Sequence, residues 1–430
     1  MTRRPALAVA VHDGFYGVGT GAGYANHAFL HTLTSLIHPG VRLVVLPVRL
    51  SPASPEYQRS WHRQTRALLQ QLGVTTYPVD NGTAGMARFG GLSAFHYLAA
   101  DTAACLTQYV LPVAEPLAVI LFDVPFLGVA PLLPPSVLPH VTTVPRSTAI
   151  LHDPTNHDRI HWERHGLHVT ADGGGHVAAI SVHMRHHLHH AYGIPEHAVV
   201  DMPDGLTRAD RRFSTTDSLL LPPAAADGFL LGMGRAQPYK GFDDLIDALI
   251  HLRDRGHRLP HTVLAAVTED LTPSRYQRHL ADRLRTSGLD ATLLTRFSPA
   301  VRALLTHPAL RAVVVPSRAE PFGRIPVEAY IAGAAPVIAT TAGGLAEQVI
   351  DGVTGLTAVP GDPDSLADAI HRGLTLTRSE RAQMRVAARR FAADRYDYTT
   401  AVGHFLCSRA PWATRHRTGR LSPADARESG

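Results

Sequence analysis

The residues best suited to chemistry in this chain are two glutamates eight positions apart, Glu320 and Glu328. They follow an apolar run at residues 312–315, which is expected to be a strand. A helix is expected to begin near Pro326, because proline has no N–H to satisfy in a first helical turn. Glu320 then lies on the loop and Glu328 about one turn inside the helix. Carboxylates accept paired hydrogen bonds from neighbouring hydroxyl groups, so this pair is suited to holding a ribose or a hexose.

Three strand-to-helix turns together would line one binding cleft, and two of them carry groups suited to phosphate. Gly323 allows close approach of a ligand, and the free N–H groups of the helical turn after it favour an anion. Arg235 and Lys240 follow a strand expected at residues 229–233 and could converge on a diphosphate. A third turn, at residues 343–344, is a pair of glycines. Lys240 is the only lysine among 41 basic residues, which suggests a position that needs a compact ammonium group; chance survival on a surface helix is the alternative.

The elements that must position these residues alternate along the whole chain. Short apolar runs separated by helical patterns are typical of parallel sheets covered on both faces. In the first half, strands are expected at residues 7–11, 41–48, 117–122, 149–152, 177–181 and 198–202. After a stretch of linker composition at 221–228, they are expected at 229–233, 262–267, 291–294, 312–315 and 336–339. The sequence therefore predicts an α/β protein with two Rossmann-like, doubly wound parallel-sheet domains that face a cleft.

Composition excludes several classes of protein. With 45% hydrophobic and 18% charged residues the chain is expected to fold, and its net charge of +5 includes no dense basic run with interleaved aromatics, so no nucleic-acid partner is expected. No apolar run approaches the ~18 residues of a membrane span, and no basic amphipathic helix is evident, so no stable membrane association is expected. The N-terminus leads directly into an apolar strand, and Cys105 and Cys407 form no motif. A cytoplasmic location is the expectation.

A family resemblance follows from these three strand-to-helix turns and the glutamates. Glu320 to Glu328, preceded by Arg235 and Lys240 and followed by the glycines at 343–344, resemble the signature of retaining nucleotide-sugar glycosyltransferases of the GT-B fold. This is the glycogen-synthase-like, or glycosyl transferases group 1, family. The resemblance is specific over residues 229–361 and looser over 177–205.

The resemblance implies a division of the chain and marks two departures. It implies an N-terminal acceptor-binding domain at 1–204, a linker at 205–227, a C-terminal donor-binding domain at 228–390, and a crossover helix with a loose tail at 391–430. Asp204 stands where the family usually has asparagine. Arg324 replaces a more usual aliphatic residue, where it would add a phosphate contact or point to solvent.

The resemblance also implies roles for individual residues. Arg235 and Lys240 would neutralise the donor diphosphate, Glu320 would contact the transferred sugar, and Glu328 would hold the ribose hydroxyls. His152 would contact the sugar or the acceptor, and it completes the implied catalytic set with Glu320, Arg235 and Lys240. The implied donor-binding residues are Gly19, Gly21, Arg235, Lys240, Gly323, Arg324, Ile325, Glu328, Gly343 and Gly344.

Two further features of the first half have competing interpretations. Asp123, after the strand expected at 117–122, is a candidate acceptor contact together with His152. Twelve of the 27 histidines fall between residues 152 and 197; spacing of i,i+4 allows a metal site, but a solvated histidine-rich helix is favoured and no metal is expected. The glycine-rich loop at 12–23 also fits the dinucleotide pattern of NAD-dependent oxidoreductases. The next strand ends without the acid that this pattern requires, which disfavours that function.

The function implied by the resemblance is retaining transfer of a hexose or N-acetylhexosamine from a nucleoside-diphosphate sugar, usually UDP-linked in this group, to an acceptor hydroxyl without metal or other cofactor. The near-neutral first half favours a small soluble acceptor. The arginine-, alanine- and histidine-rich composition suggests a high-GC bacterial gene, in which a sugar or aminocyclitol of natural-product (antibiotic) biosynthesis is a plausible acceptor. The alternatives are a sugar phosphorylase or pseudo-glycosyltransferase on the same fold, and a non-catalytic sugar-nucleotide-binding protein. A monomer or homodimer is expected.

Overall fold

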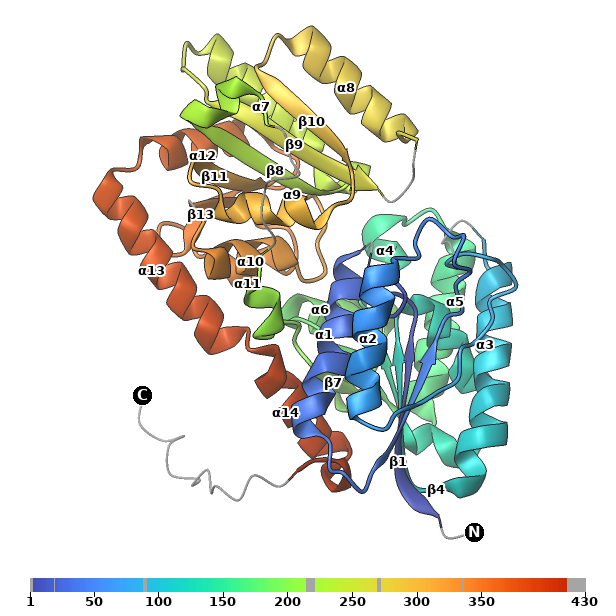
Figure 1. The fold of residues 1–430 in the computed structure, drawn as a ribbon. Coiled ribbons are helices and arrows are strands. Elements are labelled where there is room, and N and C mark those ends of the chain that lie inside the picture. Colours follow the sequence, from blue (N-terminus) through green and yellow to red (C-terminus); the bar gives the residue numbers. More distant parts are fainter. Residues whose placement is uncertain are drawn as a thin grey trace.

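The structure is a computed structural model that describes residues 3–18, 20–87, 91–213, 221–268, 272–334 and 336–415. It forms two lobes, each built on one parallel sheet with helices on both faces (Figure 1). In Figure 1 the lower lobe runs from blue to green along the sequence, and the upper lobe from green to orange. The prediction of an α/β protein with two doubly wound parallel sheets is confirmed.

The first sheet has seven described strands, all parallel, in the order β3-β2-β1-β4-β5-β6-β7. The direction of winding reverses between β1 and β4, and the carboxyl ends of strands at such a switch point form the usual ligand crevice of this fold class. The strands are β1 Arg4–Val11, β2 Arg42–Pro47, β3 Thr75–Thr76, β4 Ala114–Phe122, β5 Val141–Val144, β6 His176–Ala179 and β7 Val199–Asp201. The α-helices are α1 Gly21–Leu36, α2 Arg59–Gln71, α3 Ser93–Cys105, α4 Ala149–His152, α5 His157–Asp172 and α6 Val182–Tyr192.

The second sheet has six described strands, also parallel, in the order β10-β9-β8-β11-β12-β13, and its switch point lies between β8 and β11. The strands are β8 Phe229–Arg235, β9 His261–Thr268, β10 Ala291–Arg296, β11 Leu310–Val315, β12 Val337–Thr340 and β13 Gly355–Ala358. The α-helices are α7 Phe242–Asp254, α8 Arg275–Ser287, α9 Pro299–Ala303, α10 Arg324–Ala332, α11 Leu345–Gln348 and α12 Pro363–Thr375.

The central strands are buried along nearly their whole length, which explains their continuous apolar sequences. Residues 6–11 of β1 are fully buried, as are residues 312–314 of β11. A strand covered by helices on both faces has no solvent-facing side, so it shows no polar alternation. The hydrophobic effect therefore fixes these strands in the sheet centre, and the loops at their carboxyl ends are left to carry function.

One predicted strand is wrong. Residues 149–152 form the short helix α4, and the strand at this place in the sheet is β5, at residues 141–144. A short apolar run does not distinguish strand from helix by its pattern alone. The helix is fixed by a tertiary contact, because the buried Glu163 on α5 accepts hydrogen bonds from Ala149 N at 3.0 and 2.9 Å.

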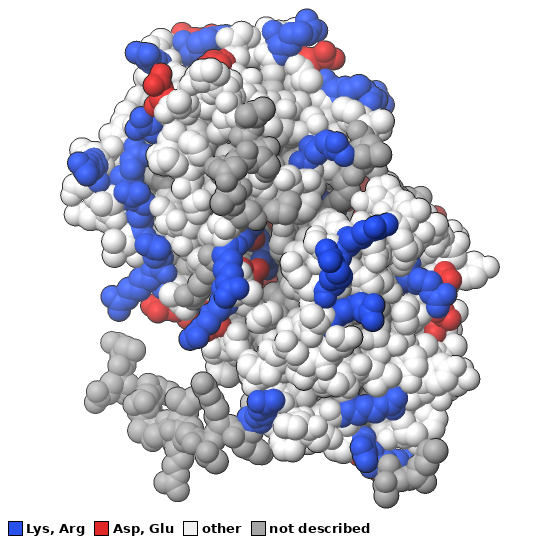
Figure 2. All heavy atoms as spheres, viewed as in Figure 1, with Lys and Arg blue, Asp and Glu red and all other residues white. Residues whose placement is uncertain are grey.

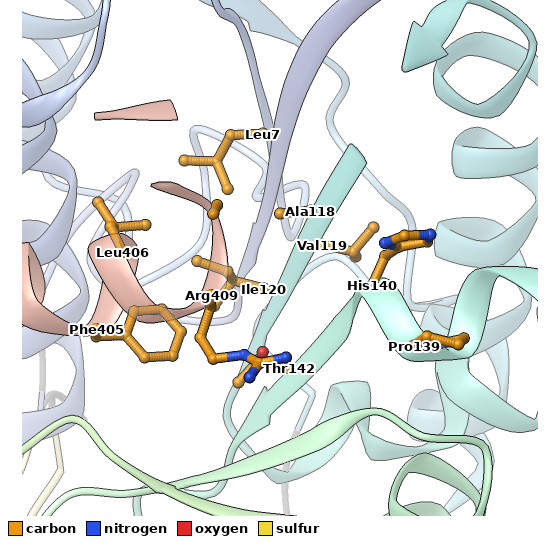
Figure 3. Close-up of a pocket in the computed structure, with 11 residues that line it drawn as sticks. Leu7, Ala118, Val119, Ile120, Pro139, His140, Thr142, Phe405, Leu406 and Arg409 are labelled. Carbon is orange, nitrogen blue, oxygen red and sulfur yellow. The ribbon is translucent and has the colours of Figure 1, made fainter. Parts of the chain in front are cut away.

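The C-terminal helices connect the two lobes. Helix α13 (Arg378–Arg395) runs along the upper lobe, and α14 (Tyr398–Arg409) packs on α1 of the lower lobe (Figure 1). A small cavity remains beneath α14, where Phe405 and Arg409 face Ile120 and Thr142 of the sheet (Figure 3). Within the described ranges no helix is both long and apolar enough to cross a membrane.

Candidate functional site

The two strands at the switch point of the second sheet place the predicted cations and glutamates together. Arg235 is the last residue of β8, and Glu320 follows β11 on the loop to α10. Lys240, two residues before α7, has its Nζ 2.5 Å from Oε2 of Glu320. The hydroxyl of Ser317 donates a 3.2 Å hydrogen bond to the same oxygen. Both side chains of the Lys240–Glu320 ion pair are largely buried, with 14% and 10% of their surface exposed.

A glycine makes the approach of these two loops possible. Gly241 has φ +68°, a left-handed conformation that side chains disfavour. A Cβ at this position would lie 1.9 Å from the carbonyl oxygen of Pro316, so a larger residue would push the β8–α7 turn away from the loop after β11. A backbone hydrogen bond of 2.7 Å from Arg318 N to Tyr239 O holds the two loops together.

His152 reaches this pair from the other lobe. Its ring centroid lies 4.3 Å from that of Tyr239, the residue beside Lys240. Burial, reinforced by the positive charges of Lys240, Arg159 and Arg235, lowers the pKa of His152 to about 3, so the ring is neutral at neutral pH. Its Nε2 atom is buried and has no hydrogen-bond partner in the part of the chain that the structure describes. A neutral imidazole with a buried free nitrogen is suited to a hydrogen bond with an uncharged ligand group such as a hydroxyl.

Tyr239 is a site residue that the sequence did not single out. Its hydroxyl accepts a 3.1 Å hydrogen bond from Nη2 of Arg235, and its ring centroid is 5.5 Å from Nζ of Lys240. It thereby fixes both cations and also forms the surface against which His152 packs. Its position in the sequence, between the two predicted cations Arg235 and Lys240, could have identified it as a site residue.

Glu328 lies one turn inside α10, as predicted, but it is already paired. Nε of Arg302 is 3.1 Å from its Oε2, and Nε of Arg324 is 3.3 Å from its Oε1. Arg324 continues to the segment between the lobes, donating to the carbonyl of Gly205 at 3.2 Å and pairing with Asp210 at 3.3 Å. We call Asp210, Arg302, Arg324 and Glu328 the arginine cluster. Arg324 is buried within it, so of the two orientations considered from sequence the solvent-facing one is wrong.

The glycine-rich loop of the first lobe faces the arginine cluster. Gly21 is the first residue of α1, whose N-cap Thr20 accepts a 2.9 Å hydrogen bond from Gly23 N. A Cβ at Gly21 would lie 3.6 Å from Cδ of Arg324, so the structure brings two predicted donor-binding residues together across the lobes. Gly19, a third such residue, lies outside the described residues.

The other predicted donor-binding residues gather around the loop of Glu320. Gly323 is the N-cap of α10 with φ +89°, and Ile325 is the second residue of that helix, partly buried against the core. Gly344 N donates a 2.9 Å hydrogen bond to the carbonyl of Glu320. A Cβ on Gly343 would lie 2.2 Å from that same carbonyl oxygen, so the glycine pair packs directly on the loop.

Asp123 lies at the switch point of the first sheet, but it is buried and is linked through Asn26 to the carbonyl of Asp13 in the glycine-rich loop. Its φ of 75° is the only positive value at a described residue other than glycine, and such strain is typical of functional sites. Its carboxylate accepts a 2.7 Å hydrogen bond from Nδ2 of Asn26, and burial raises its pKa to about 6. Asn26 in turn accepts from Arg146, which pairs with Asp204. The contact of Asp123 with an acceptor stays a prediction.

A second group of contacts joins the lobes at the start of α6. The carboxylate of Glu347, on α11, accepts hydrogen bonds from Val182 N at 3.0 Å and His183 N at 2.6 Å. The N-cap Ser181 donates at 2.6 Å to the carbonyl of Pro321, next to Glu320. A carboxylate at a helix N-terminus is favoured by the free amides and the helix dipole. Sequence reasoning missed Glu347.

The histidine-rich stretch folds as α5 and α6. Over the described residues no group of three or more histidine, cysteine or acidic side chains is arranged to hold a metal ion. Figure 2 shows that the molecular surface is hollowed between the lobes and that acidic and basic side chains lie within the hollow.

The family match falls on the second lobe. Residues 222–391 match the family glycosyl transferases group 1. A glycogen synthase of Mycobacterium tuberculosis is 34% identical over 181 residues, which are 42% of each chain. A D-inositol 3-phosphate glycosyltransferase of Frankia alni is 36% identical over 162 residues, 37% of this chain and 39% of its own. The chain thus spans about two fifths of the length of these curated relatives.

Solved structures match over almost the whole chain. A sucrose-phosphate synthase from Thermosynechococcus elongatus superposes with a TM-score of 0.73 at 18% identity, covering 95% of this chain and 99% of its own. HepE of Anabaena, solved in complex with UDP and glucose, gives a TM-score of 0.64 at 20% identity, covering 94% and 100%. The two lobes therefore have the GT-B fold, and residues 222–391, which hold Arg235, Lys240, Glu320 and Glu328, match the glycosyl transferases group 1 family.

Proposed function

We propose that this protein is a retaining glycosyltransferase that transfers a hexose or N-acetylhexosamine from a nucleoside-diphosphate sugar to a hydroxyl group of a small acceptor. The observation that carries the proposal is the Lys240–Glu320 ion pair at the β8/β11 switch point, with the neutral His152 of the other lobe against Tyr239. The family match of residues 222–391 supports it, because the motif residues of the donor domain all lie inside the matched segment.

A UDP-linked sugar is the proposed donor. Support comes from the Anabaena protein of the same fold, which was solved with UDP and glucose, and also with UDP-glucose. Arg235 and Lys240 would bind the diphosphate, with the N-terminal amides of α10 beyond Gly323 as further donors. Glu328 would accept hydrogen bonds from the ribose hydroxyls.

The proposed reaction keeps the configuration of the sugar. The bond from the sugar C1 to the leaving phosphate oxygen breaks, and a bond from C1 to the acceptor oxygen forms on the same face. The acceptor proton passes to the leaving phosphate oxygen. Arg235 and Lys240 would stabilise the negative charge that develops on the diphosphate, and fixed charges aimed at developing charge commonly make the largest contribution to rate. Glu320 and His152 would hold the sugar hydroxyls.

The proposed acceptor is a small polyhydroxylated molecule. Several curated relatives are named for D-inositol 3-phosphate, a small cyclitol derivative, which supports an acceptor of this size. A sugar or aminocyclitol of bacterial natural-product assembly stays the prediction from composition. A cytoplasmic monomer or homodimer likewise stays a prediction.

The single lysine allows a direct test of donor binding. Reductive methylation with ¹³C-formaldehyde labels only Lys240 and the α-amino group, so an NMR spectrum holds one site signal and one internal control. We expect UDP or its sugar conjugate to shift the Lys240 signal and leave the control signal unchanged. Lys240→Ala identifies the signal and should weaken donor use severely, as should Glu328→Ala. Arg255→Ala, at an exposed ion pair on the far end of α7, is a surface control.

The outcomes separate the candidate functions. Nucleotide release that depends on both donor and acceptor supports a glycosyltransferase. A Lys240 signal that responds to inorganic phosphate but to none of UDP, GDP, ADP and dTDP would favour a sugar phosphorylase. Donor binding without turnover across an acceptor panel would favour a sugar-nucleotide-binding protein instead.

A further inference from the structure

The arginine cluster is a set of balanced charges in the region where the donor is proposed to bind. Arg302 and Arg324 contribute two positive charges, and Asp210 and Glu328 two negative ones, over distances of 3.1–3.3 Å. All four side chains are at most 14% exposed. The cations nearest the proposed ribose site are therefore neutralised within the protein before any ligand binds.

Arg324 is well placed to contact a phosphate. It is the first residue of α10, directly after the N-cap Gly323, so a phosphate on the amides of this turn would lie within reach of its own side chain. The first lobe closes the other side, because the ring centroid of Tyr24 is 5.9 Å from Cζ of Arg324 and Gly21 faces its Cδ. Burial disfavours the charge of Arg324, but Asp210 and Glu328 outweigh that cost and raise its pKa, so it stays a cation.

Asp210 belongs to the segment that connects the lobes. Its Oδ2 accepts hydrogen bonds of 2.7 Å from the backbone N and the hydroxyl of Thr207, which hold the carboxylate in place independently of Arg324. Arg302 binds the backbone carbonyls of Asp210 and Arg212, and its Cζ is 4.3 Å from the ring centroid of Phe213. Two arginines of the second lobe thus tether residues 205–213.

We propose that Asp210 is an internal competitor of the donor diphosphate for Arg324. Donor binding exchanges one anion for another: the guanidinium leaves the linker carboxylate and contacts the diphosphate. A diphosphate carries more negative charge than a carboxylate and accepts paired hydrogen bonds from a guanidinium group, which favours the exchange. The linker then loses one of its two arginine tethers. The inference rests on the proposed function, and it assigns to this chain a phosphate contact at a position where the family usually has an aliphatic residue.

The test is a double-mutant cycle on Asp210 and Arg324 with UDP as the probe, measured by isothermal titration calorimetry. Asp210→Asn should tighten UDP binding about 3- to 10-fold, because it removes the competing charge and keeps an oxygen for Thr207. Arg324→Leu, which restores an aliphatic residue, should weaken binding about 10-fold. In the Arg324→Leu background, Asp210→Asn should give no gain. A thermal melt of each variant verifies that it is folded.

The matched control is Asp282→Asn, which removes an equal charge from an exposed pair on α8 and should leave UDP affinity unchanged. If wild type binds UDP but Asp210→Asn does not bind it more tightly, the competition is refuted and the proposed function stands. An equal gain in UDP affinity with and without Arg324 would also refute the competition, since the gain would then come from the loss of a nearby negative charge and not from the release of Arg324. If wild type binds none of UDP, GDP, ADP and dTDP, both proposals fall together.

Discussion

Replacing Lys240 by methionine separates its structural role from its proposed chemical one. The substitution keeps most of the side-chain volume but leaves the carboxylate of Glu320, 10% exposed, without its ion-pair partner. Removing one partner of a buried pair costs about 3–5 kcal/mol, and the partial exposure of this pair places the loss near the lower end, about 3 kcal/mol. For a domain of this size that corresponds to a fall of roughly 6–12 °C in the melting temperature of the second lobe.

A second substitution then distinguishes the two roles. In Lys240→Met with Glu320→Gln no charge is left unpaired, so we expect most of the lost stability to return. Turnover should not return, because the charge that stabilises the leaving diphosphate is still missing. Loss of one such group typically lowers kcat by about 10²–10³-fold. Calorimetric melts give the stability and donor-dependent nucleotide release gives kcat/KM.

Arg255→Met is the matched control, since it removes a cation directly after the far end of α7, from a pair that is 44% and 65% exposed. Exposed pairs contribute about 0–1 kcal/mol, so its melting temperature and turnover should stay close to wild type. If the double variant recovered turnover together with stability, Lys240 would serve only to neutralise Glu320, and the proposed role in catalysis would be refuted.

Three further predictions concern other parts of the site. The pKa of His152 is about 3 in the folded protein and 6.5 in the free side chain, so as the pH falls the unfolded chain binds a proton before the folded protein does. This difference lowers the free energy of unfolding between pH 7 and pH 5 by about 2 kcal/mol. His152→Gln should abolish that part of the loss, measured by urea titration at the two pH values. Gly241→Ala should lower the melting temperature much more than Gly361→Ala does. Gly361 has a similar φ of +72°, but a Cβ there would have nothing within 4 Å. Equal falls in melting temperature would mean that the clash with Pro316 is relieved without cost. Glu347→Gln should destabilise the protein by about 1 kcal/mol in thermal melts at low salt, and by less at high salt, because it removes a charge from the N-terminus of α6.

The part of the site that the sequence predicted is the part held by local structure. Arg235 ends β8, Lys240 and Glu320 follow β8 and β11, and the carboxyl ends of these two strands adjoin at a switch point. Their convergence therefore follows from the alternation of strands and helices. The one wrong strand has the opposite cause. The apolar run at residues 149–152 is too short for its pattern to distinguish a strand from a helix, and the hydrogen bonds that Glu163 accepts determine the helix.

The part that could not be predicted depends on contacts between segments far apart in sequence. Arg302 and Asp210 belong to no motif, yet they determine the surroundings of Glu328 and Arg324. The approach of His152 to Tyr239 depends on how the lobes lie against each other, which no local pattern encodes. The family resemblance implied that Glu328 binds the ribose of the donor. The structure adds that its carboxylate pairs with Arg302 and Arg324 within the protein.

The surroundings of Lys240 give a physical reason for the single lysine. Its ammonium group fits between the carboxylate of Glu320 and the ring of Tyr239, at 2.5 and 5.5 Å, in a space bounded by two loops that touch at Gly241. An ammonium group is compact and can direct three N–H bonds from one point, whereas a guanidinium group is planar and longer. Arginine here would have to displace Glu320 or separate the loops. Lys240→Arg should therefore lower the melting temperature and kcat/KM despite keeping the charge, and a variant with wild-type kinetics would show that chance alone preserved this lysine.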